Sequence, residues 1–328
     1  MIPALVLTAG LATRLRPLSF VRAKAALPVA GEPLVRRILR SLHAGGVTDA
    51  VLNVHHLPHS LTGCVGDGAD LGMRVRYSWE MPVLGSAGGP RHALPLLAGP
   101  GSGSPGSTFL IVNGDTLTDA SIGAVIAGHR QSGALVTMAV IRNVEPEKYG
   151  GVVVDAAGVV TGFVGRGSAQ PSYHFIGVQV AEAEAFAALP DNTPHESVAA
   201  LYPALMAARH GAVRAFICEA EFMDIGTPAD YLRTSRLLSR RDAGARGLQA
   251  PRWEQGARSA IHPSARVEDS ILWDDVQVGE GAMLRESVVT DGAHVPADTS
   301  WIGVTIRRAE GDLAPHERRV DDLAVGSL

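Results

Sequence analysis

The sequence contains little cysteine and no long apolar run, and each absence excludes a class of protein. Only two cysteines, Cys64 and Cys218, occur in 328 residues. They stand far apart without partners at metal-ligand spacing, which excludes a disulfide framework and favours reduced thiols. No apolar stretch approaches the ~20 residues of a membrane span, and the N-terminus lacks the basic stretch of a signal peptide. We therefore expect a cytoplasmic protein with no membrane partner.

Lysine is also scarce, because the chain has two lysines against 27 arginines. The net charge of −4 argues against a nucleic-acid partner, so a phosphate site has to be a local cluster of cations. The two cationic side chains are not interchangeable. Lys24, which persists despite the arginine bias, therefore indicates a place that needs a compact ammonium group.

The first 240 residues alternate apolar strands with helical stretches. Predicted strands are 2–7, 50–54, 74–78, 109–112 and 173–180, and residues 151–155 and 159–164 read as a hairpin. Predicted helices span 33–43 and 197–208. Alternation of continuous apolar strands with helices predicts a mainly parallel, mixed sheet covered by helices, an α/β fold. We expect a first domain over 1–240, a linker over 241–259 and a smaller domain over 260–328.

The C-terminal stretch shows a different period. Apolar residues recur there at steps of five to six, with one step doubled: Ile261, Val267, Leu272, Val278, Leu284 and Val295. This spacing resembles a hexapeptide left-handed β-helix of about two coils, which needs a cap or a partner copy to be stable. A homodimer is one way to meet that need. The alternative is an irregular tail with chance apolar spacing.

The strongest chemical signal lies between Leu5 and Leu34. A buried strand ends at Thr8, a loop of small residues follows over 9–13, and three cations come within the next residues: Arg14, Arg16 and Lys24. Small residues let the main chain approach a nucleotide, and main-chain N–H groups in such a turn bind anions. Neither G-x-G-x-x-G nor G-K-[ST] occurs, so a dinucleotide fingerprint and a Walker loop are not predicted.

This stretch, LVLTAGLATRLRPLSFVRAKAALPVAGEPL, closely resembles the signature of the sugar nucleotidyltransferase family, G-x-G-T-R-x-x-P-L followed by P-K and P-V-x-G-x-P. The resemblance implies a Rossmann-like nucleotide-diphospho-sugar transferase domain. It implies that the nucleotide is bound by Thr8, Ala9, Gly10, Thr13 and Arg14, with Ala9 and Gly10 at the base. It further implies that Arg14 holds the β- and γ-phosphates and Lys24 the α-phosphate. Two departures occur, Ala12 for the second glycine and Ala23 for the proline.

Two aspartates follow apolar segments, Asp115 in Val112–Asp115 and Asp224 in Phe222–Pro228. Each alone is more typical of a cap or turn. Together they match the N-G-D and D-I-G-T-P segments of the family, which implies that both chelate Mg²⁺ and that Asn113 belongs to the nucleotide site. The four catalytic residues implied in this way are Arg14, Lys24, Asp115 and Asp224.

Three further segments resemble parts of the family's substrate site. Glu80–Leu94 resembles E-x-x-x-L-G-T-A-G, in a form closer to mannose-1-phosphate guanylyltransferases, which implies nucleotide contacts from Gly85, Ser86 and Gly88. Two other glycines fall where the family places main chain near the sugar, Gly150 and Gly177. The family's F-V-E-K-P is here Phe163–Gly167, so Arg166 is expected to replace the lysine that binds the sugar phosphate.

No residue near Arg166 replaces the family's glutamate, which is Gly165 here; Glu196 and Glu221 are candidates from elsewhere. The implied reaction joins a nucleoside triphosphate, GTP before UTP, to a sugar-1-phosphate such as mannose-1-phosphate, with Mg²⁺ as cofactor. One alternative is a non-catalytic regulatory subunit that binds nucleotide sugar. Another, an acyltransferase site on the β-helix, is disfavoured because two coils cannot line the usual groove.

Overall fold

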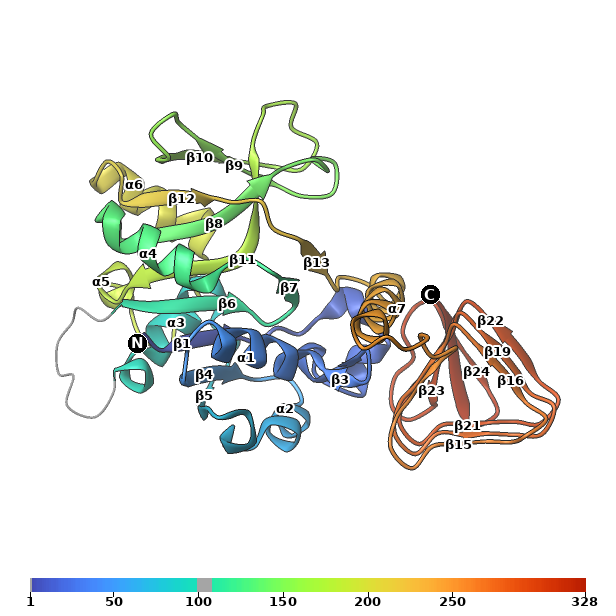
Figure 1. Cartoon of the computed structure of the whole chain (residues 1–328). Coiled ribbons are helices and arrows are strands. Elements are labelled where there is room, and N and C mark those ends of the chain that lie inside the picture. The colour runs from blue at the N-terminus through green and yellow to red at the C-terminus, as the bar shows by residue number, and fades with distance from the viewer. Residues whose placement is uncertain (1, 99–107) are drawn as a thin grey trace. The chain divides into compact units, whose positions relative to one another are not determined.

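The computed structural model describes residues 2–98 and 108–328 and divides into two compact units (Figure 1). The first unit comprises Met1–Gly10 and Val35–Met223, and the second comprises Leu11–Leu34 and Asp224–Leu328. This division differs from the domain boundary expected at residue 240. The cation-bearing stretch 11–34 groups with the C-terminal part of the chain because its contacts, described below, are made there.

The first unit contains a nine-stranded mixed sheet. Its path runs β10-β9-β11-β6-β1-β4-β5, with β8 beside β11 and β12 beside β8. The four strands β5, β4, β1 and β6 are parallel, whereas β11 runs antiparallel to β6. Its strands are β1 Ala4–Leu7, β4 Asp49–Val54, β5 Arg74–Trp79, β6 Thr108–Asn113, β8 Val136–Arg142, β9 Gly151–Val154, β10 Val160–Val164, β11 Tyr173–Glu182 and β12 Val213–Ile217. A separate two-stranded sheet pairs β7 Thr116–Thr118 with β13 Phe222–Asp224. The predicted α/β fold is confirmed, including the antiparallel β9–β10 hairpin.

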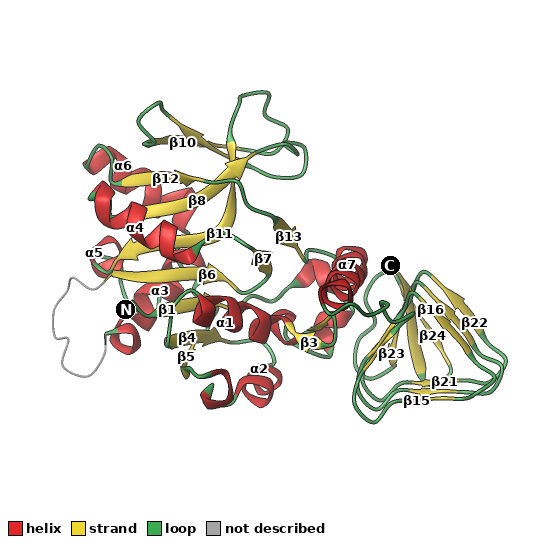
Figure 2. Cartoon of the chain, viewed as in Figure 1, coloured by secondary structure: helices red, strands yellow, loops and turns green. Residues whose placement is uncertain are grey.

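Helices flank this sheet, as the red and yellow elements of Figure 2 show. Helix α3 packs against β1, β4 and β5, and α4 packs against β8, β11 and β12. Predicted helix 33–43 is α1, whose apolar positions 34, 38, 39 and 42 are buried as its spacing indicated. The helices are α1 Leu34–Ala44, α2 Pro58–Val65, α3 Gly85–Leu97, α4 Ile122–Ser132, α5 Glu184–Ala187 and α6 Tyr202–Ala208, with short turns at Ala69–Leu71 and, just before α6, Ser197–Leu201.

The second unit begins with three short helical turns and a small hairpin. The turns are η1 Thr13–Leu15, η2 Leu18–Phe20 and η3 Lys24–Ala26, and the hairpin pairs β2 Pro28–Val29 with β3 Glu32–Pro33. Helix α7, Pro228–Ala245, packs against β2. The hydroxyl of Tyr231 on α7 donates a hydrogen bond to the Pro28 carbonyl at 2.5 Å.

A β-helix completes the second unit. Its parallel strands stack at intervals of 17 residues, as the pairing of Glu254 with Ile271 and of Ile271 with Val288 shows. Its apolar side chains point inward and are almost fully buried: Leu272, Val278, Leu284, Val289 and Val295. The strands are β14 Glu254–Gln255, β15 Ala260–Ile261, β16 Arg266–Glu268, β17 Ile271–Leu272, β18 Gln277–Val278, β19 Met283–Arg285, β20 Val288–Val289, β21 His294–Val295, β22 Ser300–Ile302 and β23 Val304–Arg308, followed by the antiparallel pair β24 Glu317–Val320 and β25 Leu323–Ser327.

The β-helix is larger than the sequence period indicated. Two of its faces have three stacked strands each, and the third has four parallel strands, β14, β17, β20 and β23. The expectation of about two coils was therefore too low. The stretch expected as a linker, 241–259, holds the end of α7 and the first coil strand β14. The antiparallel strand β25 pairs with β23 and covers the last coil edge.

Candidate functional site

The carboxyl ends of β1 and β6 meet at one edge of the sheet in the first unit. Leu7 and Asn113 are register partners, and the Gly114 N–H donates to the Leu7 carbonyl at 2.9 Å. A Cβ on Gly114 would lie 2.6 Å from that carbonyl oxygen, so the close approach requires glycine. The predicted residues Thr8 and Asn113 therefore lie at the same edge, and Asp115 follows directly. Ligands bind at this edge of open α/β sheets.

A buried network joins the loop after β1 to the segment before α3. The Oδ1 of Asn53 accepts hydrogen bonds from the N–H groups of Thr8 at 2.5 Å and Ala9 at 3.3 Å. Its Nδ2 donates to Oε1 of Glu80 at 2.7 Å, and the other oxygen of Glu80 accepts from the Leu84 N–H at 2.8 Å. Glu80 is fully buried, so these bonds fix both loops.

Sequence reasoning missed Asn53 and Glu80 as site residues. Asn53 could have been found from its position near the carboxyl end of β4. Glu80 could have been found because it begins the motif that includes Gly85. Gly10, the next predicted base contact along the loop, is exposed and has open space around its α-carbon. The network thus holds the start of this loop, and the main chain at Gly10 is exposed to solvent.

The predicted nucleotide residues Gly85, Ser86 and Gly88 form the first turn of α3. The hydroxyl of Ser86 donates to Oε2 of Glu196 at 2.7 Å, and the Ser197 N–H donates to Ser86 Oγ at 2.8 Å. A Cβ on Gly85, whose φ is +75°, would lie 2.7 Å from Glu196 Oε1. Glycine therefore lets residues 193–197 pack against this turn, which places the exposed carboxylate of Glu196 there.

Gly177 lies at a bulge in β11. The register of β11 against β8 shifts between Phe175 and Gln179, and Gly177 between them has a φ of +77°. A Cβ there would lie 3.0 Å from the Cβ of Asn113. The structure thus brings a predicted sugar-site glycine beside a predicted nucleotide-site asparagine. Bulges commonly redirect the main chain next to active sites.

An aromatic cluster surrounds His174, which lies on the same strand. The His174 ring stands 4.2 Å from the Tyr149 ring and 4.5 Å from the Phe222 ring, measured between centroids. Burial lowers the pKa of His174 below its ordinary value of 6.5, so the neutral ring is favoured. Gly150 directly follows Tyr149 and is exposed, so the cluster anchors the loop that carries this predicted sugar residue.

Arg166 lies in an exposed turn after β10 that is joined to the loop carrying Gly150. The Gly167 N–H donates to the Pro146 carbonyl at 2.9 Å. The carboxylate of Glu147 reaches this turn, since its Oε2 lies 3.4 Å from where a Cβ on Gly167 would be. Glu147 is thus an acidic side chain at the turn that carries Arg166, and sequence reasoning had not considered it.

Glu196 and Glu221, the two candidates for the role of the family's glutamate, lie in other surroundings. Glu196 is bonded to Ser86 as described, and the Glu221 N–H donates to Oδ1 of Asp119 at 2.7 Å. Glu196 therefore belongs to the turn at the start of α3.

Arg14 and Asp224 lie close together in the second unit. A Cβ on Gly226 would stand 3.1 Å from Oδ2 of Asp224 and 3.7 Å from Nη1 of Arg14. Thr13 and Arg14 are exposed residues of η1, and half-buried Lys24 begins η3. The turn after Asp224 ends at Thr227, whose side chain caps α7 by accepting a bond from the Asp230 N–H at 3.1 Å.

The main-chain conformation at Ala12 explains why the family signature has glycine at this position. Its φ of 47° and ψ of 46° are left-handed, a conformation that costs an L-residue with a side chain about 1 kcal/mol more than glycine. The main chain keeps the glycine-type turn here despite the substitution. The departure from the signature therefore leaves the loop geometry in place.

No group of three or more His, Cys, Asp or Glu side chains with metal-site geometry occurs within residues 2–98 and 108–328. Mg²⁺ does not need one, since it is commonly bound by one or two carboxylates together with substrate phosphates and water. The hard oxygen donors of Asp115, in the first unit, and Asp224, in the second, fit that chemistry.

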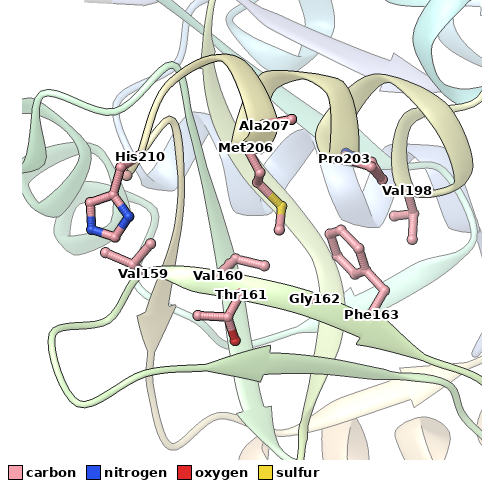
Figure 3. A pocket seen from close by; sticks show the side chains of 11 residues that line it. Val159, Val160, Thr161, Gly162, Phe163, Val198, Pro203, Met206, Ala207 and His210 are labelled. Atoms are coloured by element: carbon pink, nitrogen blue, oxygen red, sulfur yellow. The ribbon is translucent and has the colours of Figure 1, made fainter.

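A separate cavity of about 620 Å³ lies between β10 and the α6 region (Figure 3). Its lining is largely apolar and includes Val160, Phe163 and Met206, with His210 at one side. None of the predicted site residues lines it.

An open α/β sheet with a loop of small residues after its first strand is a common setting for binding phosphates. The comparison with known families makes this specific. Residues 3–241 match the family described as nucleotidyl transferase, and residues 256–313 match the GlmU-like C-terminal hexapeptide family. The chain belongs to the nucleotidyl transferase family.

Relatives of known description span most of the chain. A mannose-1-phosphate guanylyltransferase of Mycobacterium tuberculosis is 28% identical over 90% of this chain and 82% of its own length. A probable mannose-1-phosphate guanylyltransferase 3 of Oryza sativa is 29% identical over 93% and 82%. A UTP–glucose-1-phosphate uridylyltransferase of Synechocystis is 25% identical over 98% and 87%.

A solved structure shares the fold. HddC from Yersinia pseudotuberculosis superimposes with a TM-score of 0.62 at 20% identity, covering 73% of this chain and all of that one. The same protein has been solved in complex with GMP-PN.

Within the described residues, we find no helix with both the length and the apolar character that crossing a membrane requires.

Proposed function

We propose that the protein joins a nucleoside triphosphate to a sugar-1-phosphate, with GTP and a mannose-1-phosphate-like sugar favoured. A phosphate oxygen of the sugar-1-phosphate attacks the α-phosphorus and forms a new P–O bond. The bond from the α-phosphorus to the oxygen that bridges to the β-phosphate breaks, and pyrophosphate leaves. A sugar phosphate is already ionised near pH 7, so no general base is required.

The proposal rests chiefly on the position of Arg14 beside the Asp224 turn, because this pairs a phosphate-binding cation with a metal-binding type of carboxylate. Attack by one anion on another is slow mainly because of repulsion, so positioning and charge neutralisation are the chemistry needed. Arg14 would bind the β- and γ-phosphates with its planar fork, and Lys24 would bind the α-phosphate as a point charge.

Asp115 and Asp224 would hold a Mg²⁺ ion. The bound ion would supply positive charge against the α-phosphate and the incoming sugar phosphate. The aspartates themselves would orient the substrate phosphates through it, which is why both are expected to be needed. Their oxygen donors suit this ion better than the softer sites that histidine or cysteine would make.

The preference for GTP is supported by the relatives described as guanylyltransferases and by Glu196. Guanine carries two adjacent donors, the ring N–H and the amino group, whereas uracil offers a single ring N–H. Glu196 presents an exposed carboxylate at the turn of Gly85 and Ser86, and a carboxylate accepts such a donor pair well. We propose that this carboxylate reads the base.

The sugar phosphate is proposed to bind between Gly150, Gly177 and Arg166. Arg166 would take the role of the family's lysine, and Glu147 beside it would take that of the absent glutamate by accepting bonds from sugar hydroxyls. Both side chains are exposed, so a substrate can reach them.

Product analysis tests the proposal. Purified protein with Mg²⁺, GTP and mannose-1-phosphate should form GDP-sugar and pyrophosphate in equal amounts, and Lys24→Ala should form neither at a comparable rate. Nucleotide-sugar binding by calorimetry without turnover would contradict catalysis and favour the regulatory alternative. Release of free phosphate instead of pyrophosphate would contradict the bond assignment.

A further inference from the structure

Arg22, two residues before Lys24, is bound by two aspartates of the β-helix. Its Nε and Nη2 donate to the two oxygens of Asp291 at 2.7 and 2.6 Å, and Nη2 also donates to Oδ2 of Asp274 at 2.7 Å. The guanidinium stands 5.2 Å from the centroid of the Trp273 ring. The Arg22 side chain is only 17% exposed, so solvent screens these contacts far less than a surface pair.

The contacts continue along the same segment. The indole of Trp273 donates to the Tyr231 hydroxyl at 3.0 Å, and that hydroxyl donates to the Pro28 carbonyl. The Gly31 N–H donates to Oε2 of Glu254, the first coil residue, at 3.2 Å. The β-helix therefore touches this segment before and after Lys24, directly and through one tyrosine of α7.

The chemistry at position 22 requires arginine. A planar guanidinium can bond two carboxylates at once while one face lies against an indole, whereas an ammonium group offers neither the fork nor the flat face. Truncating such an arginine leaves Asp274 and Asp291 facing each other without their shared cation. The geometry is that of an anchor, and nothing in the proposed reaction needs Arg22 to touch substrate.

We infer that Arg22 is a positioning residue and that the β-helix, through Asp274 and Asp291, holds the segment that presents Lys24 to the nucleotide. The β-helix is then part of the catalytic architecture and more than an appended assembly module. This inference rests on the proposed function for the role of Lys24, but the anchor itself is a property of the fold that can be tested separately.

The chain offers a matched control. Arg258 and Asp275 form a two-point ion pair on the same β-helix, with both N···O distances 2.6 Å. Their side chains are 68% and 48% exposed, and no contact from them to residues 11–34 is among the hydrogen bonds and ion pairs of the described residues. An exposed pair of this kind contributes little to stability. Asp275 has a charge interaction with Arg22, so Asp275→Asn reports what loss of a nearby exposed carboxylate charge does while every hydrogen bond of Arg22 stays in place.

The test compares Arg22→Lys, Arg22→Met and Asp291→Asn with Asp275→Asn in the full-length protein. The first readout is amide hydrogen exchange over residues 22–31, which should become faster in the first three variants and stay unchanged in the control. The second is steady-state kinetics of pyrophosphate release, in which kcat should fall about tenfold to a hundredfold, since misplacement by about 1 Å costs that much. Calorimetry should show weaker triphosphate binding.

The outcomes separate the two claims. Exchange and kinetics equal to those of Asp275→Asn would overturn the inference, and so would faster exchange with an unchanged kcat. Wild-type protein without pyrophosphate release would contradict the proposed function, and the exchange and calorimetry would still decide whether Arg22 orders a triphosphate-binding segment. Arg22→Lys keeps the positive charge and both aspartates and removes only the planar guanidinium. It therefore separates loss of the guanidinium contacts from general unfolding. Circular dichroism shows whether each variant is folded.

Discussion

Asn53 donates a hydrogen bond from Nδ2 to Oε1 of the fully buried Glu80 at 2.7 Å, and this single amide links two loops of the proposed nucleotide site. An asparagine suits the position because its side chain is a donor on one side and an acceptor on the other. Oδ1 serves the N–H groups of Thr8 and Ala9, while Nδ2 serves the carboxylate. An ionised aspartate, which has the same shape, lacks the donor.

Asn53→Asp should therefore destabilise the fold. The substitution removes the donor and places a second carboxylate against buried Glu80, which is expected to cost about 2–4 kcal/mol. Urea denaturation at pH 7.5 measures this, with the same substitution at exposed Asn192 as control. A free energy of unfolding within about 0.5 kcal/mol of wild type, the usual range for surface changes, would show that the network does not hold these loops.

Asp115→Ala and Asp224→Ala should each nearly abolish pyrophosphate release while leaving the protein folded. The reason is that each would remove one oxygen ligand of the proposed Mg²⁺ site. Activity measured against Mg²⁺ concentration tests this, and Asp70→Ala, which removes an exposed carboxylate paired with Arg36, is the control. Wild-type dependence on Mg²⁺ in both variants would refute the ligand assignment.

Arg166→Ala should raise KM for the sugar phosphate by about tenfold or more, the effect of losing one charge-assisted contact, with little change in KM for the triphosphate. Glu147→Gln should also raise KM for the sugar phosphate. Arg130→Ala removes an exposed arginine from α4 and should leave both constants unchanged. A defect confined to the triphosphate would move Arg166 to the nucleotide site.

His174 should make stability depend on pH in the acidic range. Its folded-state pKa lies below 6.5 because the ring is buried, so the folded protein binds fewer protons there than the unfolded chain. Its contribution is complete above pH 6.5 and is lost as the pH falls below that value. His174→Gln should flatten this part of the profile between pH 7.5 and 5, measured by urea denaturation. An equal effect from exposed His59→Gln would contradict the assignment to His174.

Much of the first unit could be predicted from the sequence. Buried parallel strands are continuous apolar runs, so β1, β4 and β6 stood out, and the four apolar positions of α1 identified its buried face. The start of the β-helix did not stand out. Its first strand, Glu254–Gln255, is polar, and Glu254 is buried through hydrogen bonds with Ser235 instead of apolar contact.

The grouping of residues 11–34, the proposed phosphate-binding segment, with the β-helix could not be predicted either. It depends on pairs such as Arg22 and Asp274, which are 252 residues apart and carry no local pattern. Asn53 is a similar case, because a single amide at a strand end becomes meaningful only when Glu80 lies beside it. By contrast, Arg14, Asp115 and Asp224 belonged to contiguous motifs, which is why they could be proposed without the fold.

The central claim, that this chain is a sugar-1-phosphate nucleotidyltransferase, is tested most directly by measuring pyrophosphate release across four nucleoside triphosphates and several sugar-1-phosphates with Mg²⁺. We expect release that depends on both substrates, with GTP and mannose-1-phosphate the strongest pair. Absence of release with every pair, while calorimetry still detects bound nucleotide, would contradict the claim.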